Sequence, residues 1–133
     1  MIPTQDLCIG NWVYDGDRTQ FPMFIRAIGE DYVYLDFEGN EGDLFESTPE
    51  ELQGILLKRN ILDQLGFVAD GYRYEKFDGD WTITIHPFVP LVRIECELSG
   101  TVRATFTSEK IKYLHELQNA FYMTTKQELK INL

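Results

Sequence analysis

The sequence has no segment of the kind that enters or crosses a membrane. Its first residues, MIPTQDLCIG, lack the basic start and the apolar run of about 7 to 15 residues that a secretory signal needs. No stretch approaches the roughly 18 uncharged apolar residues of a membrane-spanning helix. We therefore predict a cytoplasmic protein without membrane contact.

Cysteine is scarce, with Cys8 and Cys96 as the only two, both among residues typical of strands. Two cysteines are too few to indicate a disulfide framework or a cysteine-based metal site. We expect two buried, reduced thiols that form no disulfide.

Basic residues are absent between Arg26 and Lys58, and all of the net charge lies in the first part of the chain. Residues 1–57 hold 12 acidic residues against two arginines, whereas residues 58–133 hold ten of each sign. The basic-free stretch carries nine carboxylates, namely Glu30, Asp31, Asp36, Glu38, Glu41, Asp43, Glu46, Glu50 and Glu51. Such a surface repels phosphate, so we expect no direct binding of nucleic acid.

Motifs for catalysis and metal binding are also absent. His86 and His115 are the only histidines, and neither HExxH nor G-x-S-x-G occurs. Residues 36–47 alternate oxygen ligands like a calcium loop, but Glu41 stands where that loop needs glycine and Ser47 where it needs glutamate. We predict no metal and no cofactor, and do not favour an enzyme.

The chain is long enough for one domain with its own core, since 44% of its 133 residues are apolar and 14% are aromatic. We predict an α+β fold over residues 1–133, which could subdivide into a β-barrel-like part, 1–53, and an α+β part, 54–133. Turn residues separate strand-like runs at 7–14, 21–28, 31–37 and 43–47. They predict a twisted antiparallel sheet or small open β-barrel.

A short helix is predicted over 58–65, with Gly66 as its C-terminal cap and Ile61, Leu62 and Leu65 facing inward. A β-meander follows, with strands predicted at 71–77, 81–88, 91–98 and 101–107. Ser108 is the expected N-cap of a last helix, and the final residues ELKINL indicate a short terminal strand.

The last helix carries polar residues close to its apolar face. On a helical wheel Gln118 lies inside the apolar arc, His115 lies on its flank with access to water, and Asn119 points further out. A buried glutamine needs partners, so we expect its amide to bond the backbone of a neighbouring strand. The functional alternative is a polar pocket formed by His115, Gln118 and Tyr122.

A second candidate surface lies on the strand-like run DYVYLDF. Tyr32, Tyr34 and Asp36 alternate there with apolar residues, which places them on one face that is wet or at an interface.

The C-terminal third, KYLHELQNAFYMTTKQELKI, resembles the closing segment of a group of small uncharacterised proteins of phages, prophages and other mobile elements of gut anaerobes. The matching residues are His115, Leu117, Gln118, Asn119, Phe121 and Tyr122. LCIGNWV and GILLKRNILDQLGF are similar to the opening strand and the leucine-rich helix of the group. The chain departs from that pattern at 123–126, where a glycine is missing, and at Gly54 and Leu56, where prolines are usual. The resemblance implies a genomic setting and brings no activity, cofactor or catalytic residue.

Three functions remain open. The first is a non-enzymatic accessory protein of a mobile element that meets an unknown protein partner through exposed aromatic and acidic residues. The second is a DNA mimic whose acidic half occupies a nucleic-acid-binding enzyme. The third is a small hydrolase that uses His86 or His115. Oligomeric state is not predicted.

Overall fold

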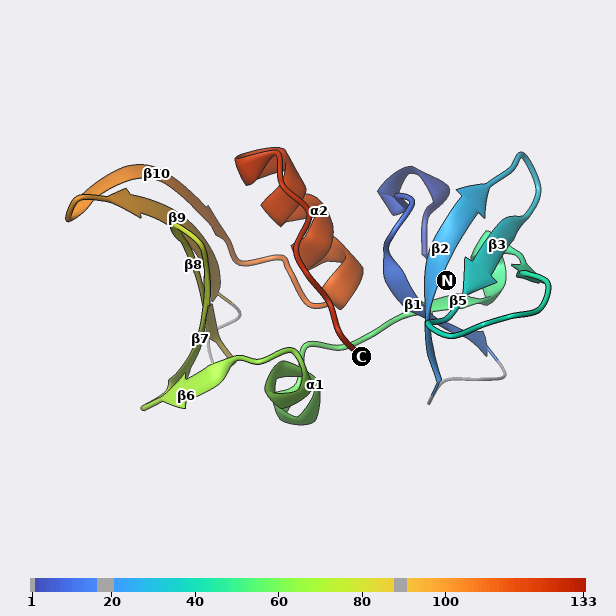
Figure 1. Ribbon diagram of the computed structural model, residues 1–133, viewed down its shortest axis with the longest axis horizontal. Coiled ribbons are helices and arrows are strands. Elements are labelled where there is room, and N and C mark those ends of the chain that lie inside the picture. The colour runs from blue at the N-terminus through green and yellow to red at the C-terminus, as the bar shows by residue number, and fades with distance from the viewer. Residues whose placement is uncertain (1, 17–20, 88–90) are drawn as a thin grey trace. The chain divides into compact units, whose positions relative to one another are not determined.

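The structure is a computed structural model that describes residues 2–16, 21–87 and 91–133 (Figure 1). The chain divides into two compact units. The first contains Met1–Leu56 and Tyr113–Asn119, and the second contains Leu57–Lys112 and Ala120–Leu133. The division considered from the sequence lay between residues 53 and 54. It did not include Tyr113–Asn119 in the first unit.

The first unit holds an open five-stranded antiparallel sheet in the order β4-β3-β2-β1-β5. Its strands are β1 (Trp12–Asp15), β2 (Pro22–Ile28), β3 (Val33–Asp36), β4 (Phe45–Ser47) and β5 (Leu52–Gly54). Two 3-10 helices, η1 (Thr4–Asp6) and η3 (Pro49–Glu51), precede β1 and β5. The predicted twisted antiparallel sheet is therefore present, as an open sheet.

The first strand is shorter than predicted, because the chain turns before Trp12. Gly10 has a φ of +93°, a left-handed conformation that suits glycine, and the N–H of Asn11 donates back to the carbonyl of Cys8. β5 was not predicted. Its three residues form a strand by pairing with β1, with Val13 opposite Gly54.

The core of the first unit is built from alternate residues of these strands. Val13, Met23, Ile25, Leu35 and Leu52 are fully buried, and Phe37 and Phe45 pack against the cluster at its margin. The period-two alternation of the strands thus brings one apolar face together.

The second unit holds another open antiparallel sheet, in the order β10-β9-β8-β7-β6 (Figure 1). Its strands are β6 (Val68–Asp70), β7 (Arg73–Asp78), β8 (Trp81–His86), β9 (Leu91–Leu98) and β10 (Thr101–Ser108). The predicted β-meander is confirmed, with β6 as an additional strand. β8 ends at His86, and the remainder of the predicted run extends to Phe88, which lies outside the described residues.

The short helix α1 (Arg59–Gln64) confirms the prediction for 58–65. Ile61, Leu62 and Leu65 are buried, and Gly66 follows with a φ of +86°. In the core of this unit Phe121 is fully buried and makes an edge contact with Trp81, with ring centroids 6.4 Å apart.

The last helix, α2 (Leu114–Thr125), begins five residues later than a cap at Ser108 predicts. Ser108 is instead the final residue of β10, where it pairs with Val92. The helix starts where the N–H of Tyr113 donates to the Glu116 carboxylate at 3.0 Å, which is half of a capping box. The predicted terminal strand is wrong, since residues 128–133 form no strand, although Leu129 is buried.

The cysteines correct another expectation. Both are free thiols, as predicted, but Cys8 is exposed and Cys96 is only partly buried. Cys8 lies at the surface because it belongs to the turn that precedes β1. Within the described ranges, no helix has the length and apolar character needed to span a bilayer.

Candidate functional surfaces

Gln118 joins the first half of α2 to the backbone beside β1. Its Oε1 accepts a hydrogen bond from the N–H of Trp12 at 2.8 Å, and its Nε2 donates to the carbonyl of Gly10 at 3.0 Å. Both halves of the amide therefore bond main-chain groups before or at the start of one strand, as expected for a structural glutamine.

Asn119 extends the same network, which corrects the expectation that it points outward. Its Oδ1 accepts from Nδ2 of Asn11 at 2.8 Å, and its Nδ2 donates to the carbonyl of Asp6 at 2.9 Å. Asn11 is 2% exposed, and its Oδ1 accepts from the N–H of Cys8. We call Asn11, Gln118 and Asn119 the amide network.

His115 is enclosed, which contradicts its predicted position on a wet flank. The residue is 3% exposed, stacks on the ring of Tyr113, and has no hydrogen-bond partner at Nδ1. Burial lowers the pKa of His115, and the carboxylates of Glu116 and Asp6 oppose this shift only in part. A neutral, enclosed imidazole without a hydrogen-bonded partner at Nδ1 is poorly placed to act as a catalytic base.

The predicted polar patch on α2 is thus divided by the fold. Gln118 and Asn119 bond the N-terminal segment, His115 is buried, and Tyr122 is 52% exposed and belongs to the second unit. The hydrogen bonds of Gln118 and Asn119 give these residues a structural role, because they connect α2 to the N-terminal segment within the first unit.

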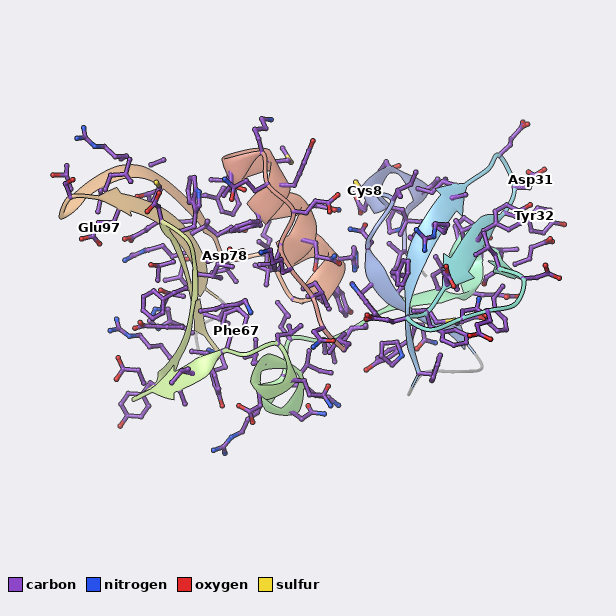
Figure 2. The ribbon with its side chains drawn as sticks, viewed as in Figure 1. Cys8, Asp31, Tyr32, Phe67, Asp78 and Glu97 are labelled. Atoms are coloured by element: carbon purple, nitrogen blue, oxygen red, sulfur yellow. The ribbon has the colours of Figure 1, made fainter. Side chains whose placement is uncertain are left out.

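The predicted strand face is also divided. Tyr32 is 45% exposed in the turn between β2 and β3, where Figure 2 shows it next to Asp31. Tyr34 is partly buried and pairs with Glu46 across the sheet. Asp36 is only 8% exposed, so its predicted place on a wet or interface face is wrong.

Asp36 anchors the loop that follows β3. One carboxylate oxygen accepts from Arg26, whose Nη2 lies 2.9 Å away, and the other accepts from Nδ2 of Asn40 and from the N–H of Phe37. The hydrogen bond from Asn40 and the ion pair with Arg26 hold the pKa of Asp36 below its usual range. The residue is occupied by the fold, so it is not available for a partner.

An aromatic cluster that the sequence did not predict lies at the edge of the first core. The rings of Phe21 and Phe37 meet edge to face at 5.3 Å, and those of Phe37 and Phe45 lie 5.8 Å apart. Phe21 is 47% exposed, and Leu44, next to Phe45 in the chain, is 40% exposed. We call the rings of Phe21, Phe37 and Phe45, together with Leu44 beside Phe45 in the chain, the aromatic cluster. Each ring begins or flanks a strand, and the sequence pattern did not show that the three rings meet.

Uncompensated carboxylates flank this cluster along the chain. Of the nine between Arg26 and Lys58, all except Asp36 are exposed. Within the described ranges none of these eight is in a salt bridge. Glu38, Asp43 and Glu46, which we call the acidic rim, stand within two residues of a member of the cluster. The first unit as a whole has thirteen acidic residues against two arginines.

The other groups considered for chemistry do not assemble into a centre. His86 is partly buried at the end of β8, where it pairs with Leu91. No three His, Cys, Asp or Glu side chains among the described residues are grouped so that they could hold a metal ion.

Comparisons of the chain with protein families, curated proteins and solved structures gave no match.

Proposed function

We propose that the protein is a non-enzymatic interaction protein of the cytoplasm, and that its first unit docks a cationic, partly apolar segment of a partner protein. The aromatic cluster and the acidic rim form the docking surface. The observation that carries the proposal is that exposed apolar side chains and carboxylates without a salt bridge in the described ranges occur together at the end of β3 and at β4.

Each part of this surface supplies one component of binding. Phe21 and Leu44 offer apolar area that a partner can remove from water, and aromatic residues are enriched at the centres of interfaces. The carboxylates attract a positively charged partner and speed its encounter. Lysine or arginine stems can cover the rings while their charged ends meet the rim.

Binding of a synthetic peptide that alternates lysine and leucine tests the proposal by titration calorimetry. Phe21→Ser with Leu44→Ser should weaken binding about tenfold, because it removes the apolar anchors. A matched pair, Ile9→Ser with Tyr32→Ser, changes residues that are exposed to 66% and 45% elsewhere in the same unit. This control should bind like the parent, and equal losses in both pairs would reject the aromatic cluster as the surface.

The charged rim is tested in the same way. Glu38→Gln, Asp43→Asn and Glu46→Gln together should weaken binding more than the neutralisation of Glu30, Asp31 and Glu50, which removes the same charge from other exposed positions. An equal effect of the two triple variants would mean that only net charge attracts the peptide.

A DNA-mimic role is the second candidate, favoured by the eight exposed carboxylates between Arg26 and Lys58, none of which is in a salt bridge within the described ranges. A mimic presents carboxylates in place of phosphates. Its inhibition of a DNA-binding enzyme should therefore weaken as carboxylates are removed and should be unchanged by substitutions in the aromatic cluster. Loss of inhibition in the Phe21→Ser, Leu44→Ser variant would therefore count against mimicry and for docking.

The mobile-element setting is part of the proposal and is supported by the resemblance of the C-terminal third to phage and prophage proteins. Genes for phage structural, replication or defence proteins beside the gene for this chain would support it. A gene neighbourhood made up of housekeeping metabolic genes would contradict it.

A further inference from the structure

The four sheet edges of the described chain differ in length. Three are formed by strands of three residues, β4, β5 and β6, whereas the fourth is β10 with eight residues. Short edge strands are a common protection against pairing with another chain. β10 alone lacks this protection.

β10 is also uncovered along most of its length. Residues 97–105, which include the turn of the β9–β10 hairpin, are all exposed, and Figure 2 shows Glu97 near that turn. Leu98 and Val102 are 43% and 51% exposed there. A hairpin with little packing on its faces is marginally stable by itself, so it gains from a further strand.

The regular part of this edge is residues 104–108. The pairing with β9 is irregular between Val102 and Ala104, and the only charged residue of the strand, Arg103, lies at that irregularity. The sequence that follows, ATFTS, has no charge and no proline. It therefore lacks the charged side chains and prolines that protect other edges.

The free hydrogen-bonding groups of the edge follow from the direction of the β9 backbone. The N–H of Glu97 donates to Asp80, on the β8 side, at 3.0 Å. Since successive residues of a strand alternate in the direction of their backbone groups, Ile94 and Val92 bond towards β10, and their partners Phe106 and Ser108 bond inward. Thr105 and Thr107 consequently present their N–H and C=O groups outward.

We propose that β10 is an interaction surface that pairs, antiparallel, with β10 of a second copy of this chain. The two-fold axis lies at Phe106, which faces Phe106 of the second copy, and Thr105 and Thr107 of one chain pair with Thr107 and Thr105 of the other. The outward groups then form two hydrogen-bonded pairs, and threonine and aromatic side chains meet across the strands. Such an isologous contact closes a dimer, which is the commonest symmetric assembly.

The charge of the second unit is compatible with a second copy as the occupant. The second unit has ten basic and nine acidic residues, so two such units do not repel one another. The neutral edge offers no charge to select a strongly acidic or basic strand, whereas it complements itself.

Sedimentation equilibrium of the full chain over a micromolar concentration range tests the inference. The parent should form a dimer. Thr105→Lys with Thr107→Lys places like charges opposite one another in the dimer and should give a monomer, as should Thr105→Glu with Thr107→Glu. An equimolar mixture of the two variants should associate again as a heterodimer, because opposite charges then face each other.

Thr82→Lys with Thr84→Lys is the matched control, because the register places Thr82 and Thr84 on the same sheet face, two strands from the edge. This variant should remain dimeric. Thr105→Pro provides an uncharged test, since it removes an outward N–H and leaves the β9–β10 ladder intact, and it should also give a monomer. The inference would be overturned by a monomeric parent or by a lysine–glutamate mixture that stays monomeric. It would also be overturned if the edge variants remained dimeric while their circular dichroism spectra matched that of the parent.

Discussion

Oδ1 of Asn119, in the last helix, lies 2.8 Å from Nδ2 of Asn11, which precedes the first strand. The two residues are 108 positions apart, and the bond connects two segments of the first unit that share no local sequence signal. Because Asn11 is 2% exposed, water cannot readily replace Asn119 as the hydrogen-bond partner of its amide. The hydrogen bond is therefore a tertiary contact on which the stability of the first unit depends.

Asn119→Ala should lower the free energy of unfolding by about 1 to 3 kcal/mol, because it leaves a buried amide of Asn11 unpaired. Urea unfolding followed by circular dichroism measures the loss. The double variant with Asn11→Ala should show a coupling of about 0.5 to 3 kcal/mol between the two sites. Additive effects would show that the link contributes nothing of its own.

Gln118→Ala should also cost about 1 to 3 kcal/mol, since it removes the partners of the Trp12 N–H and the Gly10 carbonyl. Met123→Ala, at a helix position that is 73% exposed, is the control and should stay within about 0.5 kcal/mol of the parent. A Gln118→Ala protein as stable as the parent would restore this part of α2 as a candidate ligand site.

The contrast between Gln118 and Asn119 shows what the sequence could predict. Gln118 lies on the apolar arc of the helix, so the helical wheel alone predicts that its amide needs backbone partners. The helical wheel gives no such prediction for Asn119, because its partners Asn11 and Asp6 lie more than a hundred residues away in the sequence. The same limit hid the aromatic cluster, whose rings come from the ends of separate strands.

Local signals behaved likewise in the fold. Asp-Gly and Ser-Gly turns define the β-meander from neighbouring residues, and its strands were predicted from them. β5 depends on pairing with β1, so its three residues alone did not predict a strand. Ser108 has the chemistry of a helix cap, but strand pairing with Val92 prevails over that preference.

Acid should destabilise the protein through His115. Its pKa is lowered in the folded state by burial, so between that value and the ordinary pKa of about 6.5 the unfolded chain binds the proton more readily. Stability from this residue is present above about pH 6.5 and is lost as the pH falls below it. His115→Phe keeps an aromatic ring beside Tyr113 and should reduce the fall in unfolding free energy between about pH 7 and about pH 5.5. An unchanged fall in the variant would assign the effect to other groups.

Moderate salt should stabilise the first unit. The eight exposed carboxylates between Arg26 and Lys58 have no salt bridge within the described ranges, and their mutual repulsion is screened when the Debye length shortens to about 8 Å at physiological ionic strength. The melting temperature should rise between low and moderate sodium chloride. A fall would mean that these carboxylates are compensated by basic groups in solution.

The proposed docking surface is formed by the aromatic cluster and the acidic rim, whereas the amide network is structural. Nuclear magnetic resonance mapping of backbone amides during titration with the lysine–leucine peptide distinguishes these two roles. The largest shifts should fall on Phe21, Leu44 and Phe45 and on the rim residues beside them. Shifts centred on His115, Gln118 and Asn119, or no shifts at all, would contradict these assignments.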